Sequence, residues 1–272
     1  MHRVADNITL LCSLYKSEAP DRLEQFLSSI QKQDKMPAKI VVVLDGQIPH
    51  DLMTILETYK ELLPMNILPK KWSGLPDSLN YGLDFIDTGW VARCDTDDLL
   101  HSNFITFFSK SIAELDNNVA LVSGNVIKNY GSSSFHEERI SRYIDKTYFW
   151  FRIKNIIYHP AVCFKKDIVL SAGGYPKGRM EDYRLWYKLV ALGNKLYISN
   201  DVVATLSSFD QAYRRTGLDY FLSELDLFTL KIKTKQIYYL PVDLIVFILR
   251  SLLRIKSIRI LLQYLRVVMA RR

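Results

Sequence analysis

The chain has 272 residues, of which 49% are hydrophobic, and a formal net charge of +7, so it can bury one sizeable core. Its three cysteines, Cys12, Cys94 and Cys163, include no C-x-x-C pair, which argues against a disulfide framework and against a zinc site. No run approaches the ~20 apolar residues of a membrane span, and no apolar signal-peptide region follows Met1. The sequence therefore predicts a cytoplasmic protein.

The excess positive charge lies at the C-terminal end. After Asp243 the chain has no acidic residue and seven basic ones, which equal the whole net charge of +7. The rest of the chain is neutral, whereas a nucleic-acid-binding protein carries basic residues on a face of its globular body. We therefore expect no nucleic-acid partner.

Strand-like and helix-like patterns alternate along the chain. The predicted elements are strands over residues 8–14, 39–44, 67–68, 90–93, 119–126, 159–164 and 196–206, and helices over about 20–30, 52–62, 77–82, 102–115 and 181–192. Such alternation predicts an α/β fold, in which a parallel sheet carries helices on its faces. Ligands of these sheets bind at the carboxyl ends of the strands, where Asp45 and Asp95 both lie.

Three carboxylates, Asp95, Asp97 and Asp98, follow the apolar run that begins at Trp90. In an extended segment, residues two apart point to the same side, so Asp95 and Asp97 can face one point in space. Packed carboxylates repel one another unless a cation lies between them, and oxygen ligands suit Mg²⁺ and Mn²⁺. This pattern indicates a metal–diphosphate site, with an acidic turn or a helix N-cap as the alternative.

Several other classes of site lack their sequence patterns. A dinucleotide-binding sheet needs glycines after its first strand, and Ser13–Glu18 contains none. The five histidines form no H-x-x-x-H pattern, which argues against a histidine metal site. No serine lies in a G-x-S-x-G context.

Six segments are informative in combination: ITLLCSLYK, IVVVLDG, GLPDSLNYGL, VARCDTDDLL, IIYHPAVCFKKDIVLSAGGY and EDYRLWYKLVALG. In this order and at these separations they resemble the family 2 glycosyltransferases of bacterial O-antigen and exopolysaccharide assembly. The likeness covers residues 8 to about 206. It implies a GT-A-type nucleotide-sugar-binding fold, with a mostly parallel central sheet flanked by helices. We expect a catalytic domain over residues 1–206 and a C-terminal helical region over 207–272.

The resemblance implies a nucleotide-sugar site at the first strands. Asp45 matches the acid that accepts a hydrogen bond from the uracil ring of a UDP-sugar, and a carboxylate is a suitable acceptor for the imide N–H. The alternative for Asp45 is a turn before Gly46. Leu14 and Tyr15 are implied contacts of the nucleotide-sugar. Arg93 matches a family arginine near the nucleotide, and an ion pair within the acidic cluster is equally compatible with its position.

The resemblance also implies a role for each aspartate. Asp97 would be the more direct ligand of Mg²⁺ or Mn²⁺, and Asp95 would face the ribose or the metal. Such a cation neutralises charge that develops on the departing UDP. Asp98 is expected to cap the following helix.

Glu181 and Asp182 match the paired acids on the acceptor side of the family. We expect Asp182 to be the base that deprotonates the acceptor hydroxyl in a single inverting displacement, with Glu181 orienting the acceptor or Asp182. The alternative is that both are acids favoured at a helix N-terminus. Trp186 could stack on a sugar or belong to the core, and His159 is expected to be structural or to line the acceptor site.

The C-terminal region reads as two basic amphipathic helices, one after Pro241 and one over residues 256–268. Such helices suit an anionic cytoplasmic leaflet, so we expect the protein to lie on the inner face of the cell membrane. The alternatives are a helical subdomain packed on the body and a dimer interface.

The sequence therefore predicts an inverting transferase that moves a sugar from a UDP-sugar donor to a lipid-linked oligosaccharide acceptor, with Mn²⁺ or Mg²⁺ as cofactor. A sugar-phosphate nucleotidyltransferase is the first alternative, although its glycine-rich, basic first loop is missing. The second is a catalytically idle relative that binds sugar or membrane.

Overall fold

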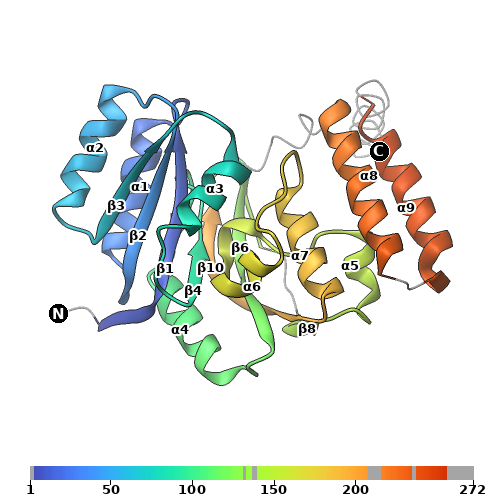
Figure 1. Ribbon diagram of the computed structural model, residues 1–272. Helices are drawn as coiled ribbons and strands as arrows, with labels where there is room; N and C mark the ends of the chain where they lie inside the picture. Colours follow the sequence, from blue (N-terminus) through green and yellow to red (C-terminus); the bar gives the residue numbers. More distant parts are fainter. Residues whose placement is uncertain (1–2, 131–132, 137–139, 208–215, 235–236, 256–272) are drawn as a thin grey trace.

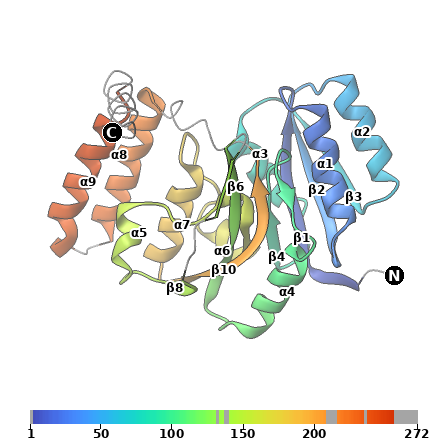
Figure 2. The same ribbon diagram turned by 180° about the vertical axis from the view of Figure 1, so that it is seen from behind.

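The computed structural model describes residues 3–130, 133–136, 140–207, 216–234 and 237–255. A sheet runs through the centre of the molecule, helices lie on both sides of it, and α8 and α9 stand side by side at the end remote from the N-terminus (Figures 1 and 2).

The strands of the described residues are β1 (Arg3–Tyr15), β2 (Lys35–Asp45), β3 (Met65–Lys70), β4 (Trp90–Arg93), β5 (Leu99–Leu100), β6 (Val119–Tyr130), β7 (Ser133–His136), β8 (Arg142–Ile144), β9 (Val162–Lys165) and β10 (Lys195–Leu206). The helices are α1 (Pro20–Gln31), α2 (His50–Lys60), α3 (Leu75–Leu83), α4 (Phe104–Glu114), α5 (Phe149–Ile153), α6 (Lys166–Ser171), α7 (Glu181–Ala191), α8 (Leu218–Lys233) and α9 (Leu240–Leu252), with short 3-10 helices η1 (His159–Ala161) and η3 (Ile237–Tyr239).

The strands form one sheet in the order β3-β2-β1-β4-β9-β6-β10-β5, with β7 paired to β6 and β8 paired to β10. The neighbours from β3 to β4 are parallel, as the strand–helix alternation predicts. Beyond β4 the sheet is mixed, because β9 runs antiparallel to both β4 and β6, while β6 and β10 are parallel. The predicted α/β fold, a central sheet flanked by helices, is confirmed. The sheet of the described residues is not mostly parallel as expected, because β5, β7, β8 and β9 all pair with their neighbours in the antiparallel direction.

The sheet separates two apolar cores. Neighbouring residues of a strand point to opposite faces, so Leu10 and Val42 join the core beneath α1, α2 and α4, whereas Leu11 and Val43 join the core beneath α3, α6 and α7. Because both faces are covered, the central strands read in the sequence as continuous apolar runs.

The direction of β9 brings η1 to the carboxyl edge of the parallel strands. Val162 at the start of β9 pairs with Arg93 at the end of β4, so η1 lies beside the acidic segment. The strand predicted over 159–164 begins only at Val162, and His159–Ala161 form a 3-10 turn instead. Pro160 lacks the N–H that a sheet ladder requires.

The chain continues into a helical pair after β10 ends at Leu206. There α8 packs on both α7 and α9. Within α9, Asp243 is buried and pairs with Arg152 of α5 and Lys231 of α8. The helix predicted over 256–268 lies outside the described residues, and the domain division at 206 stays a prediction. None of the described helices combines the length and apolarity needed to cross a membrane.

Candidate active site

A cleft of about 440 Å³ lies at the edge of the sheet where β4 meets η1. Its walls come from the turn after β4, from η1, from the start of α7 and from α8 and α9. The lining residues with charged, imidazole or amide side chains are Arg93, Asp95, Asp97, Asp98, Asn155, His159, Glu181, Asp182, Arg250 and Arg254. The cleft therefore brings the predicted metal ligands and the predicted acid pair together.

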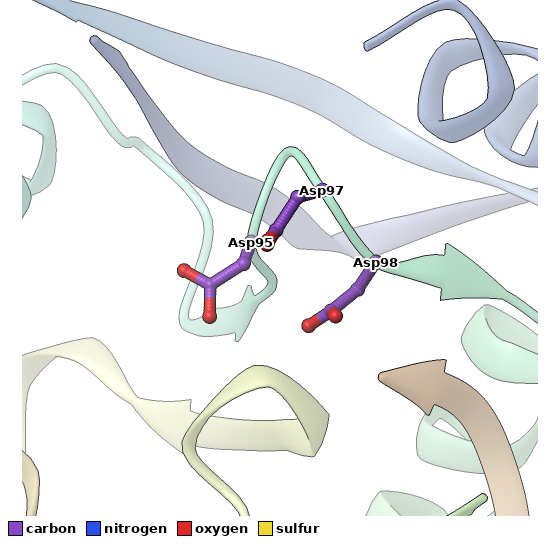
Figure 3. Close-up of side chains that lie close together, drawn as sticks. All are labelled: Asp95, Asp97 and Asp98. Carbon is purple, nitrogen blue, oxygen red and sulfur yellow. The ribbon is translucent and has the colours of Figure 1, made fainter. Parts of the chain in front are cut away.

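Asp95, Asp97 and Asp98 lie on one turn, and each offers a carboxylate oxygen within 4.8 Å of the others (Figure 3). Mg²⁺ holds its oxygen ligands at about 2.1 Å, so two ligands on opposite sides of one ion lie ~4.2 Å apart. The observed spacing needs only a small adjustment of the side chains to reach that geometry. The residues present thus fit the predicted divalent cation in both ligand type and spacing.

The predicted helix cap at Asp98 is wrong. The N-cap position of α4 belongs to Asn103, and β5 lies between the two residues. Asp98 is buried and accepts a hydrogen bond from the backbone N–H of Ser207 over 3.0 Å. Burial and the charges of Asp95 and Asp97 raise the pKa of Asp98 well above its ordinary value. A cation among the three carboxylates would oppose this shift.

Arg93 forms an ion pair with Asp95, which is one of the two alternatives that the sequence left open. Nη1 of Arg93 donates to Oδ2 of Asp95 over 2.8 Å, and Nη2 donates to Oδ1. The Arg93 side chain is 1% exposed, whereas that of Asp95 is 37% exposed. A bidentate pair of this kind fixes the orientation of the carboxylate, so Arg93 holds Asp95 at the cleft. Its contact with the nucleotide stays a prediction.

The loop after β1 contacts the aspartate turn. Oγ1 of Thr96 donates to Oε2 of Glu18 over 2.8 Å, and Arg22 approaches Asp97 at 3.7 Å. Burial raises the pKa of Glu18. Glu18 was not predicted from the sequence, because a single glutamate before a helix has no distinguishing pattern.

Asp45 lies at the carboxyl end of β2, as predicted, and is 5% exposed. It accepts hydrogen bonds from the backbone N–H groups of Ser73 (2.8 Å) and Gly74 (3.0 Å), which hold the segment before α3. In β1, which lies beside β2 in the sheet, Tyr15 pairs with Asp45 and is half exposed, but Leu14 is fully buried. The side chain of Leu14 therefore belongs to the core, and only its backbone is left to contact a nucleotide.

The Glu181–Asp182 pair opens α7 after a residue of unusual conformation. Met180 has φ +55° and is the one non-glycine residue of positive φ in the described ranges; such conformations cluster at functional sites. Nδ2 of Asn155 donates to Oδ2 of Asp182 over 2.8 Å, and the backbone N–H of Ile157 fixes the amide by donating to its Oδ1. Burial and the neighbouring Asp182 raise the pKa of Glu181 to about 7.

His159 and Trp186 differ in their access to the cleft. His159 lines it, and its Nε2 lies 3.2 Å from the hydroxyl of Tyr175. Burial and the charge of Arg93 lower the pKa of His159 well below its ordinary value, so its imidazole is neutral. Trp186 is fully buried among aromatic rings. The sugar-stacking alternative for Trp186 is therefore wrong, because its ring faces the core.

Further polar residues line the cleft without a site role predicted from the sequence, among them Asn155, Tyr220, Arg250 and Arg254. No motif marks Asn155 or Tyr220. The two arginines share a helix face with Asp243. Three charged residues on one face of an otherwise apolar helix are the signal that could have placed this face against the body.

The sheet, with the aspartate turn at the end of β4, has the GT-A-type fold of two solved glycosyltransferases. The chain matches S. aureus TarS 1-349 in complex with UDP-GlcNAc, with a TM-score of 0.66 and 14% identity. The match covers 82% of this chain and 66% of the TarS chain. It also matches the mannosyltransferase PcManGT of Pyrobaculum calidifontis, solved with GDP-Man and Mn²⁺, over 96% of this chain and 80% of the other, with a TM-score of 0.59 and 16% identity. The chain spans slightly less than two thirds of TarS 1-349.

The sequence model of glycosyl transferase family 2 matches residues 13–169. The chain is 32% identical over 260 residues to the amylovoran biosynthesis glycosyltransferase AmsE of Erwinia amylovora, a match that covers 93% of this chain and 96% of AmsE. It is 28% identical over 227 residues to the UDP-Gal:alpha-D-GlcNAc-diphosphoundecaprenol beta-1,3-galactosyltransferase of Escherichia coli, over 80% of each chain. The chain belongs to glycosyl transferase family 2. The resemblance found in the sequence is confirmed, and the nucleotidyltransferase alternative has no support.

Proposed function

We propose that the chain is an inverting glycosyltransferase that moves a sugar from a UDP-sugar to a lipid-linked saccharide in bacterial surface-polysaccharide synthesis. The observation that carries this proposal is that the Asp95–Asp97 turn and the Glu181–Asp182 pair line one cleft. The names of the relatives support it, since one belongs to amylovoran biosynthesis and another uses UDP-Gal and a diphosphoundecaprenol-linked acceptor. The UDP-GlcNAc complex of TarS supports the choice of donor.

On the donor side, Asp45 accepts the imide N–H of uracil. Each carboxylate oxygen has two lone-pair sites, so the bonds from Ser73 and Gly74 leave Asp45 with acceptor capacity. Asp97 and Asp95 are the residues that would hold Mn²⁺ or Mg²⁺, which supplies Lewis-acid neutralisation of the charge on the departing UDP.

On the acceptor side, Asp182 takes the proton from the acceptor hydroxyl. As that oxygen bonds to the anomeric carbon of the donor, the bond from this carbon to the diphosphate oxygen breaks and the electron pair leaves with UDP. One displacement of this kind inverts the configuration and needs no covalent enzyme intermediate. Asn155 orients Asp182 by donating to one of its oxygens, and Glu181 lies beside it to orient the acceptor.

We further propose that α8 and α9 rest on the inner face of the cell membrane, and that α9 contacts it through apolar side chains and not through its basic face. Asp243, Arg250 and Arg254 of the α9 segment all contact groups of α5, α7 or α8. The outward side chains are apolar. Those at least 38% exposed are Leu240, Leu244, Ile245, Ile248, Leu249, Leu252, Leu253 and Ile255. An apolar helix face of this size suits insertion at the boundary of headgroups and acyl chains.

The donor and base assignments are tested by UDP release from a panel of UDP-sugars with Mn²⁺ and a bacterial lipid extract as acceptor source. Asp97→Asn should lose both Mn²⁺-dependent UDP binding and turnover. Asp182→Asn should retain UDP binding but lose about 10²- to 10⁴-fold in turnover, the usual contribution of a general base. Asp87→Asn, at an acid whose side chain is 92% exposed, is the control. Turnover by Asp97→Asn equal to that of the control would contradict the donor site.

A further inference from the structure

The wall of the cleft formed by α8, α9 and the residues after α9 differs in charge from the rest of the lining. The turn after β4 and the start of α7 contribute carboxylates, whereas Arg250 and Arg254 are the charged residues that the described parts of α8, α9 and the residues after α9 contribute to the lining. Tyr220 of α8 completes this wall. One cleft thus has an acidic side and a basic side.

The two guanidinium groups of the basic wall are held in place from behind. Nε of Arg250 donates to Glu224 over 2.9 Å, and Nη2 of Arg254 donates to the same carboxylate. Arg250 lies over the ring of Tyr183 (5.2 Å) and Arg254 over the ring of Tyr220 (5.1 Å). Glu224 itself is 2% exposed and is not part of the lining. The arginines are therefore preorganised, with part of each side chain open to the cleft.

The basic wall adjoins the acid pair. Sδ of Met180 lies 3.3 Å from Nη2 of Arg250 and 3.3 Å from Nη2 of Arg254. Met180 directly precedes Glu181 in the chain. A saccharide whose hydroxyl reaches Asp182 therefore has its next substituents close to the two guanidinium groups.

The charge pattern decides what kind of substituent fits there. Arginine forks bind phosphate oxygens in pairs, and partial burial strengthens such charge-assisted bonds. A carbohydrate hydroxyl is uncharged, so its hydrogen bonds to two fixed guanidinium groups are weaker than those of a phosphate. In the proposed function the diphosphate of the donor lies beside the aspartate turn, which leaves the basic wall to a second phosphate group.

We propose that Arg250 and Arg254 form a subsite for the phosphate groups that join the acceptor saccharide to its carrier lipid. This inference rests on the proposed function and names the acceptor class as a glycosyl phosphate or diphosphate of a lipid alcohol. The acceptor sugar lies between the acid pair and the arginines, and its lipid leaves the cleft on the side of α9. The outward apolar residues of α9 lie on the same helix, so the chain is directed to the surface on which the lipid resides.

The test is the binding of farnesyl diphosphate to the full chain by titration calorimetry in EDTA, so that no divalent cation links the diphosphate to the aspartates. Arg250→Gln and Arg254→Gln should each weaken binding about tenfold or more, and tenfold is 1.4 kcal/mol. Glu224→Gln keeps both arginines and removes the carboxylate that competes for them, so it should tighten binding. A loss of structure would not produce this gain. Arg184→Gln, which breaks an ion pair with Asp226 outside the cleft, should bind as the wild type does.

Two further ligands separate the sources of the anion. Inorganic pyrophosphate should bind more weakly than farnesyl diphosphate and with the same dependence on the arginines, and farnesol should show no such dependence. Equal affinities of all four variants for farnesyl diphosphate, or pyrophosphate binding as tightly as its lipid ester, would overturn the proposal. UDP binding with Mn²⁺ is measured in parallel, because it reports on the donor site and stays intact if only the acceptor subsite is wrong.

Discussion

Asn155 donates a hydrogen bond from Nδ2 to Oδ2 of Asp182 over 2.8 Å, and its own Oδ1 accepts the backbone N–H of Ile157. The second bond fixes which end of the amide faces Asp182. One oxygen of the carboxylate is thereby occupied by a donor, and the carboxylate is held in one orientation. Asn155 is therefore a positioning residue for the proposed base.

Replacing Asn155 by alanine should lower kcat while leaving UDP binding unchanged. A hydrogen bond to a charged group contributes ~1.5–3 kcal/mol, so the loss in kcat should be about ten- to hundredfold. Asn194→Ala is the matched control, because the amide of Asn194 bonds to the backbone of Leu189 at the end of α7. Wild-type kcat in Asn155→Ala would argue that Asp182 needs no orientation, and a raised UDP Kd would place Asn155 on the donor side.

The pKa of Glu181 predicts how stability depends on pH. Burial and the neighbouring Asp182 raise this pKa from 4.5 to about 7, so between these values the folded state binds more protons than the unfolded state. The stability that this carboxyl group contributes must then fall as the pH rises from about 4.5 to about 7. The loss attributable to it is at most about 3.4 kcal/mol. Glu181→Gln should remove this component and be more stable than the wild type at pH 8, as measured by urea unfolding at several pH values. An unchanged pH profile would contradict the raised pKa.

The buried pair of Asp243 and Arg152 should be essential to the attachment of α9. Asp243→Asn leaves Arg152 and Lys231 without their counter-charge in a buried site, and breaking such a pair costs about 3–5 kcal/mol. Asp226→Asn removes a partner that is 60% exposed and should cost at most ~1 kcal/mol. Thermal unfolding of both variants makes the comparison. Equal melting temperatures would show that α9 is not held by this pair.

Binding to vesicles should depend on the outward apolar face of α9. Ile245→Gln combined with Leu249→Gln changes two side chains that are each 57% exposed, so the fold should tolerate both changes. Cosedimentation with vesicles of bacterial lipid should fall severalfold, because each buried apolar side chain contributes roughly 1.5–3 kcal/mol. Leu192→Gln, at an equally exposed leucine at the end of α7 (61%), should leave binding as it is. Unchanged sedimentation of the double variant would remove α9 from the membrane contact.

Much of the fold follows from periodicity in the sequence. The runs at residues 8–14 and 39–44 became β1 and β2 because a strand with two covered faces is apolar throughout. The insertion of β9 between β4 and β6 was not predictable in the same way. It depends on pairing between residues more than 60 positions apart, such as Arg93 with Val162, and nothing in the local pattern of either strand encodes the direction of that pairing.

The site was predictable where chemistry concentrates several acids in a short segment. Asp95 and Asp97 were found in this way, whereas Glu181 and Asp182 were found from the family resemblance, and both pairs line one cleft. It was harder to predict which residues of a segment border the cleft and which are buried in the core. Trp186 is on the buried side of α7 although it lies one turn after the acids, because the first turn of a helix can border a cleft while the next turn faces the core.

For α9, the sequence pattern did not predict which face of the helix is exposed. Asp243 and Arg250 share a face of α9, and Arg254, just after the helix, contacts the same Glu224 as Arg250. Amphipathicity alone does not say which face meets water. Here the charged face turns inward, because Arg152, Lys231 and Glu224 supply buried partners. The apolar face is left outside.

The central claim is that Asp95 and Asp97 hold a divalent cation in the cleft that the acid pair also lines. The most direct measurement is an anomalous difference map from crystals grown with UDP and MnCl₂. We predict a manganese peak in contact with the carboxylates of Asp97 and Asp95 and with the diphosphate of UDP. A map in which UDP is bound but manganese is missing, or lies away from both aspartates, would contradict the account.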